Sequence, residues 1–250
     1  GMSSFPQSTS QSDCKSVCLK GSWSATGRAP CTTCAAGTVN PNDRSTTASA
    51  CVNCGAGLWS GEGQASCAKC PPGKFRSILS ETTQCEPCPE GYFAPLEGSK
   101  TCKQCSPGSY SQSGQSECSR CPAGTFNTAT GSTSQSDCIK CAAGMYSSAG
   151  SAVCTKCPQG SYSSNTGSSD CDLCAPGTFS AVEGAASPST CNPCPETKFS
   201  SKPGSIQCDA CPSGKSSLVG FSQCVALCSI NYRSVSGMDL PNDRCAPCAA

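Results

Sequence analysis

Cysteine is the residue type whose number and spacing could carry chemistry in this chain. The 250 residues include 28 cysteines and no histidine, and the cysteines fall into fourteen close pairs. Twelve pairs have the spacing C-x-x-C, whereas Cys14/Cys18 and Cys224/Cys228 have one more residue between them. Thiols spaced in this way could form disulfides, bind zinc or work as a redox centre.

Disulfides account for this pattern best. Two C-x-x-C pairs in a cytosolic chain would indicate a four-thiolate zinc site, but an unbroken series of pairs without any histidine favours disulfides. A thioredoxin-like centre needs one reactive pair at the start of a helix in a βαβ context, which this sequence lacks. We therefore expect neither a metal nor a cofactor.

The stretches between the pairs form thirteen consecutive loops. Each loop runs from an opening cysteine, the second of one pair, to a closing cysteine, the first of the next, which stands 13 to 17 positions later. Closing such a loop stabilises the fold by roughly 3 kcal/mol in the chain-entropy model. A ladder, in which each disulfide joins cysteines of two different repeats, remains an alternative, because sequence does not fix connectivity. The preferred pairing is Cys18 with Cys31, Cys34 with Cys51, Cys54 with Cys67, Cys70 with Cys85, Cys88 with Cys102, Cys105 with Cys118, Cys121 with Cys138, Cys141 with Cys154, Cys157 with Cys171, Cys174 with Cys191, Cys194 with Cys208, Cys211 with Cys224, and Cys228 with Cys245.

Glycines and aromatic residues recur at fixed places in the loops. A first glycine stands three residues after the opening cysteine in eleven of thirteen loops, and Thr197 and Asn231 replace it in the others. A second glycine stands four residues before the closing cysteine in eight loops. The first glycine, often in C-P-x-G, indicates a tight turn. The aromatic two residues later should begin a short strand, cover a disulfide and contact the neighbouring repeat; these residues are Trp23, Trp59, Phe75, Phe93, Tyr110, Phe126, Tyr146, Tyr162, Phe179 and Phe199.

These elements predict the fold class. A repeat of about seventeen residues is too short to build a core of its own, so disulfides must replace the core. Glycine, serine, threonine and proline dominate the spacers, and no long apolar periodic stretch is present. We expect small disulfide-rich tandem repeats that form an elongated, solenoid-like rod, with short β-hairpins and turns and almost no helix.

The ends of the sequence suggest that the array is cut within repeats. Residues 8–14 and 132–138 share seven letters that end at a cysteine, and 248–250 match the start of a repeat. We therefore expect 1–13 to end a preceding repeat, 14–248 to form the array and 249–250 to begin a further repeat. Cys14 and Cys248 would pair with cysteines outside this sequence.

Composition bounds the location and the class of function. Cysteine above 10% of the residues indicates an oxidising compartment, so we expect an extracellular or cell-surface protein. A net charge of +1, with 13% charged residues, predicts contact with neither nucleic acid nor membrane. Without histidine or a recurring pair of acidic residues, an enzyme is not expected.

Two motifs carry a family resemblance. The stretches Cys121-Pro-Ala-Gly-Thr-Phe and Cys157-Pro-Gln-Gly-Ser-Tyr-Ser resemble the ephrin-receptor-like cysteine-rich repeat. They are also similar to the first module of tumour-necrosis-factor-receptor repeats, whose loop pairing is the one preferred above. The resemblance implies an extracellular rod, in a family that occurs in receptors, protist surface proteins, adhesins and fibres. Departures from the pattern are Thr197, Ser216, Asn231 and Arg233.

Two functions suit an array of neutral, nearly identical repeats. The first is a structural protein, a rod segment of a larger filament, cell-surface coat or flagellar hair resembling a mastigoneme, whose partner is itself. The alternative is the ligand-binding or adhesive ectodomain stalk of a receptor, whose partner is another extracellular protein or glycoprotein. A ligand site would need a repeat unlike the others, and the candidates are 215–221 and 230–238.

Overall fold

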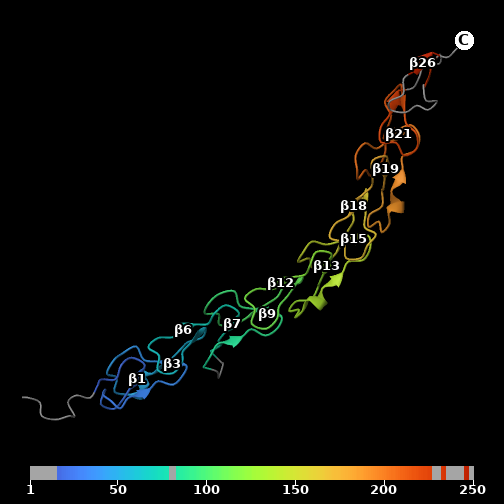
Figure 1. Cartoon of the computed structure of the whole chain (residues 1–250). Helices are drawn as coiled ribbons and strands as arrows, with labels where there is room; N and C mark the ends of the chain where they lie inside the picture. The colour runs from blue at the N-terminus through green and yellow to red at the C-terminus, as the bar shows by residue number, and fades with distance from the viewer. Residues whose placement is uncertain (1–15, 79–82, 227–231, 235–244, 248–250) are drawn as a thin grey trace, which may run out of the picture. The chain divides into compact units, whose positions relative to one another are not determined.

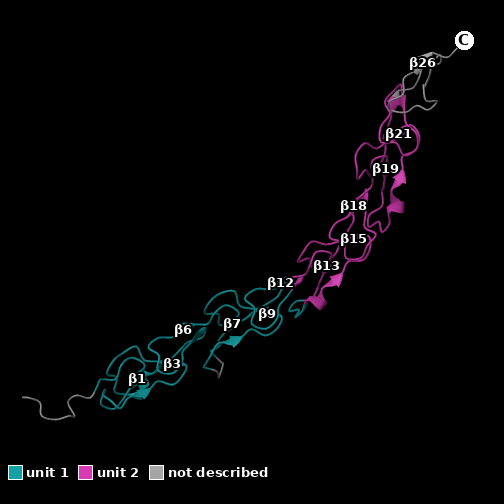
Figure 2. Ribbon diagram, in the orientation of Figure 1, with its two compact units in different colours: residues 1–106, 110–119, 130–134 teal, residues 107–109, 120–129, 135–250 magenta. Residues whose placement is uncertain are grey.

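The structure is a computed structural model that describes residues 16–78, 83–226, 232–234 and 245–247. Its contacts divide the chain into two compact units (Figure 2). Unit 1 holds residues 1–106, 110–119 and 130–134, and unit 2 holds 107–109, 120–129 and 135–250. Within each unit the hairpins follow one another in chain order (Figure 1).

Each of the first twelve loops forms a hairpin of two two-residue strands. The first strand begins four residues after the opening cysteine, and the second is formed by the two residues between the cysteines of the next pair. The two strands pair antiparallel. The hairpins are β1 (Ser22–Trp23) with β2 (Thr32–Thr33), β3 (Thr38–Val39) with β4 (Val52–Asn53), β5 (Leu58–Trp59) with β6 (Ala68–Lys69), β7 (Lys74–Phe75) with β8 (Glu86–Pro87), β9 (Tyr92–Phe93) with β10 (Lys103–Gln104), β11 (Ser109–Tyr110) with β12 (Ser119–Arg120), β13 (Thr125–Phe126) with β14 (Ile139–Lys140), β15 (Met145–Tyr146) with β16 (Thr155–Lys156), β17 (Ser161–Tyr162) with β18 (Asp172–Leu173), β19 (Thr178–Phe179) with β20 (Asn192–Pro193), β21 (Lys198–Phe199) with β22 (Asp209–Ala210), β23 (Lys215–Ser216) with β24 (Val225–Ala226) and β25 (Tyr232–Ser234) with β26 (Cys245–Pro247).

Three short 3₁₀ turns account for the helical residues in the described part of the chain, which has no α-helix. They are η2 (Ala48–Ala50), η3 (Gln135–Asp137) and η4 (Pro188–Thr190). Each lies just before the closing cysteine of a loop with a sequence separation of 17. The extra residues of the long loops are thus taken up in a 3₁₀ turn. The predicted fold class, tandem disulfide-closed hairpins with almost no helix, is confirmed.

The first glycine of each repeat makes the turn that starts the hairpin. Gly124 has φ of 82°, in the left-handed region that glycine adopts without a steric penalty. The following N–H, of Thr125, then donates to the Pro122 carbonyl at 3.1 Å. Thr197 keeps the same conformation, with φ of 66°, although it has a Cβ. Hence the departure at Thr197 leaves the turn intact, while Asn231 lies outside the described residues.

Opening cysteines and small polar residues form the buried interior. Ten of the opening cysteines are at most 1% exposed, whereas their closing partners are half-buried or exposed. The ten repeat aromatics are all half-buried. The hairpin at Ser216, which lacks an aromatic, still forms. Repeats of this size therefore bury sulfur and hydroxyl groups more completely than rings.

Candidate functional site

The disulfides close one loop each. Twelve bridges join the opening cysteine of a loop to its own closing cysteine, from Cys18 with Cys31 to Cys211 with Cys224, with Cα–Cα distances of 5.5 to 5.8 Å. This is the connectivity preferred from the sequence, not the ladder across two repeats. The thirteenth expected bridge, to Cys245, stays a prediction, because its partner Cys228 lies outside the described residues, as do Cys14 and Cys248.

Backbone hydrogen bonds join each repeat to the next. The N–H of the first glycine donates to the carbonyl of the residue six positions after the next opening cysteine, as from Gly124 to Ser147 at 2.8 Å. The N–H of the second glycine donates back to the preceding opening cysteine, as from Gly150 to Cys121 at 2.9 Å. The same bonds recur along unit 1 and along unit 2, each considered by itself. We call this set of contacts the junction.

The junction also reaches the repeat after next. The first glycine lies against the carbonyl of the second glycine two repeats later, and a Cβ there would overlap the carbonyl oxygen. Glycine is therefore required at this position for close backbone approach as well as for its φ. The sequence led us to expect contact mainly between adjacent repeats, and the second contact is a finding of the structure. The pairs are Gly21 with Gly63, Gly57 with Gly98, Gly73 with Gly114, Gly91 with Gly131, Gly108 with Gly150, Gly124 with Gly167, Gly144 with Gly184, Gly160 with Gly204, and Gly177 with Gly220.

A buried polar side chain donates a hydrogen bond across five of the junctions. The Ser111 hydroxyl donates to the Tyr92 carbonyl at 3.0 Å, and Ser147 donates to Thr125 at 2.9 Å. Asn40 takes this place in its repeat and donates its amide to the Ser22 carbonyl at 2.8 Å. These three side chains are at most 2% exposed. Burying a hydroxyl or amide is favourable only when it is hydrogen-bonded, so the contact fixes how successive repeats fit.

Arg76 takes the place of the buried polar side chain at one junction. No second glycine is present between Cys70 and Cys85. The Arg76 guanidinium donates to the Cys54 carbonyl at 3.0 Å and to the Leu58 carbonyl at 2.8 Å. The second of these carbonyls is the one that the buried serine contacts elsewhere. One long side chain thus donates a hydrogen bond to each of these two carbonyls.

Sequence reasoning missed part of the junction. In the long loops the second glycine is displaced, and Gly131, Gly184 and Arg44 occupy its place with φ of 68°, 68° and 57°. All three precede the closing cysteine by seven residues instead of four, and this common offset was the available signal. The buried serine was visible as the last letter of C-P-x-G-x-[YF]-S, but a serine in a serine-rich chain gives no indication of burial.

Within residues 16–78, 83–226 and the two short strands near the C-terminus, no group of three or more histidine, cysteine, aspartate or glutamate side chains could hold a metal ion. In the same part of the chain no helix is long and apolar enough to cross a membrane.

Tandem hairpins closed by one disulfide each, and joined by backbone contacts, define a class of cysteine-rich repeat. The family model described as tyrosine-protein kinase ephrin type A/B receptor-like matches residues 76–113, 91–138 and 144–191. The chain therefore carries ephrin-receptor-like cysteine-rich repeats in tandem. Such repeats are typically non-catalytic, and no catalytic domain is identified in the chain.

Two longer proteins share part of this array. The sushi, von Willebrand factor type A, EGF and pentraxin domain-containing protein 1 of Rattus norvegicus and that of Mus musculus are each 40% identical to this chain over 133 residues. The match covers 53% of this chain and 3% of either relative. Together with the many disulfides, the repeats identify an extracellular cysteine-rich repeat segment.

Proposed function

We propose that the array is a structural element, a stiff rod segment of a larger extracellular filament, cell-surface coat or flagellar hair. The observation that carries the proposal is the junction, which within each unit links repeats by backbone hydrogen bonds to the next and, at nine first glycines, by glycine packing to the repeat after next. A hinge between repeats of one unit would have to break several buried contacts at once. Stacked repeats with this coupling resist bending, as a structural spacer requires.

The surface supports repeated lateral contact with further copies of the same protein. Both residues between the cysteines of most pairs are exposed and belong to a strand, for example β14 and β16. Because these strands recur once per repeat, a neighbouring molecule would meet the same surface again at every repeat. Repetition of a weak contact raises the avidity of an assembly without any single strong site.

A receptor or adhesive stalk is the second candidate. The observation that favours it is the stretch 215–221, where Leu218 is 42% and Val219 is 55% exposed. Adjacent exposed apolar side chains in a serine-rich array could contact another extracellular protein. The other stretch singled out for this role, 230–238, cannot be assessed, because most of it lies outside the described residues.

Small-angle scattering and electron microscopy would test the structural proposal together. A compact domain of 250 residues has a radius of gyration of about 18 Å, and we expect a much larger value for the monomer. Microscopy at increasing concentration should then show rods that associate along their sides or ends. A radius near the compact value would contradict the rod. Dispersed single rods at every concentration, with Leu218→Ser/Val219→Ser abolishing binding to cells, would favour the stalk.

A further inference from the structure

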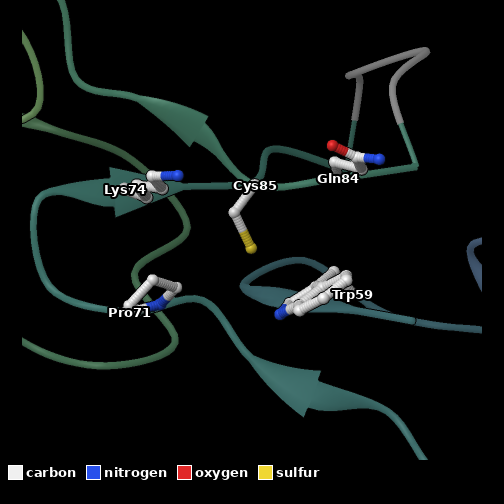
Figure 3. A pocket seen from close by; sticks show the side chains of 5 residues that line it. All are labelled: Trp59, Pro71, Lys74, Gln84 and Cys85. Carbon is white, nitrogen blue, oxygen red and sulfur yellow. The ribbon is translucent and has the colours of Figure 1, made fainter. Parts of the chain in front are cut away.

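A small hollow lies between two repeats of unit 1. It has a volume of about 120 Å³ and is lined by Trp59 from one repeat and by Pro71, Lys74, Gln84 and Cys85 from the next (Figure 3). Pockets that enclose drug-sized ligands usually measure about 300–1,000 Å³. This hollow would therefore hold a single ring or end group of a larger ligand.

The lining groups define the chemistry of that ring. The indole of Trp59 is half-buried and faces the hollow from the side opposite Pro71 and Lys74 (Figure 3). Lys74 and Gln84 are exposed at the rim. Among the described residues, the Lys74 ammonium has no ion-pair or hydrogen-bond partner. An indole face packs well against the C–H groups of a pyranose, an amide bonds to hydroxyls, and an ammonium attracts a carboxylate.

The same set of residue types recurs elsewhere in the chain. An aromatic is followed in the next repeat by proline one residue after the opening cysteine, lysine four after it and glutamine just before the closing cysteine. This holds for Phe179 with Pro195, Lys198 and Gln207, and for Phe199 with Pro212, Lys215 and Gln223. At Phe126 the corresponding residues are Ala142, Met145 and Val153. The Phe126 position therefore provides an internal control without charge or amide.

We propose that the hollow at Trp59 binds a carboxylated sugar residue, a uronic or sialic acid at the end of or within an extracellular glycan. The pyranose ring stacks on the indole of Trp59, its carboxylate faces Lys74, and a hydroxyl contacts the Gln84 amide. The sites at Phe179 and Phe199 bind the same residue more weakly, because a phenyl ring offers a smaller stacking surface than an indole. This inference is independent of the structural role proposed above.

Ligand-observed NMR titration of the whole chain tests the proposal. The probes are a hyaluronan tetrasaccharide, which supplies uronate, and sialyllactose, which supplies sialate; lactose is the neutral control. A single exposed site of this size should bind with a Kd on the order of 1 mM. The probe that binds more tightly identifies the source of the carboxylate. Weak binding of all three probes with equal affinity, or none, would overturn the proposal.

Three variants test what the indole ring and the ammonium group each contribute to sugar binding. Trp59→Ala should reduce affinity at least about tenfold, a difference of about 1.4 kcal/mol, and Phe126→Ala should leave it unchanged. Lys74→Gln, an exposed substitution that leaves the fold undisturbed, should abolish the preference for carboxylated over neutral sugar. An unchanged affinity in Trp59→Ala, or an unchanged preference in Lys74→Gln, would contradict the assignment.

Discussion

At the residue scale, the two glycines of one contact have different roles. Gly73 and Gly114 have φ of 81° and 77°, so alanine is unfavourable at either position by about 1–2 kcal/mol. A Cβ at Gly73 would also overlap the Gly114 carbonyl, whereas a Cβ at Gly114 would meet only the Pro87 side chain at 3.5 Å. The pair therefore separates close packing from backbone conformation.

We expect Gly73→Ala to destabilise the junction by about 1–3 kcal/mol more than Gly114→Ala does, because overpacking adds to the conformational penalty. Amide hydrogen exchange at Gly98, which donates to Cys70, and at Cys88 reports on this junction. Equal loss of protection in the two variants would show that only the φ of the glycines matters.

Arg76 gives a second prediction at this scale. Its guanidinium donates to carbonyls of two residues, Cys54 and Leu58, that the backbone and a serine satisfy elsewhere. Lysine presents a single ammonium in place of the planar fork, and serine is too short to reach both carbonyls. Arg76→Lys and Arg76→Ser should each lower protection of the 54–67 loop by about 1–3 kcal/mol, because a buried carbonyl loses its donor. Retention of full protection in Arg76→Ser would mean that Arg76 is dispensable.

At the scale of the element, the 3₁₀ turns are insertions that leave the hairpin unchanged. Gly131 stands seven residues before Cys138, and removing the three residues of η3 (Gln135–Asp137) would restore the usual spacing of four. The closing cysteine would then stand 14 positions after the opening one, as Cys171 does after Cys157.

We expect the deletion of 135–137 to keep the Cys121 to Cys138 bridge and to change stability by less than about 1 kcal/mol, since loop closure depends weakly on length. Deletion of 148–150 from the next loop, which Cys141 and Cys154 close, is the control. It removes Gly150 from its contact with Gly108. Amide hydrogen exchange of the residues in β13 and β14 measures the effect of both deletions. Equal damage from the two deletions would refute the view of η3 as a neutral insertion.

The elements show how far sequence reasoning reaches. Cysteine spacing and the first glycine were sufficient to predict hairpins, since a loop closed by a disulfide at fixed spacing has few conformations. The contact of Gly124 with Gly167 was not predictable, because it joins repeats that are not adjacent and leaves no mark beyond glycines already explained by turns. Ser147 shows the same limit, as its burial depends on how two repeats fit together.

At the scale of the whole molecule, the account depends on one disulfide per loop. The loop pairing makes each of the twelve described loops a separate closed unit, joined to its neighbours by hydrogen bonds and packing. A ladder across two repeats would instead make neighbouring repeats covalently inseparable. Zinc or free thiols at the C-x-x-C pairs would remove the closed loops altogether.

Non-reducing tryptic peptide mapping decides among these cases most directly. Trypsin cleaves after Lys103, Arg120, Lys140 and Lys156. It yields three consecutive peptides with two cysteines each, 104–120, 121–140 and 141–156. We predict that all three are released singly, each lighter than its reduced form by the two thiol hydrogens lost on forming its own bridge. Recovery of these peptides linked to one another, or with alkylatable thiols in the untreated protein, would contradict the account.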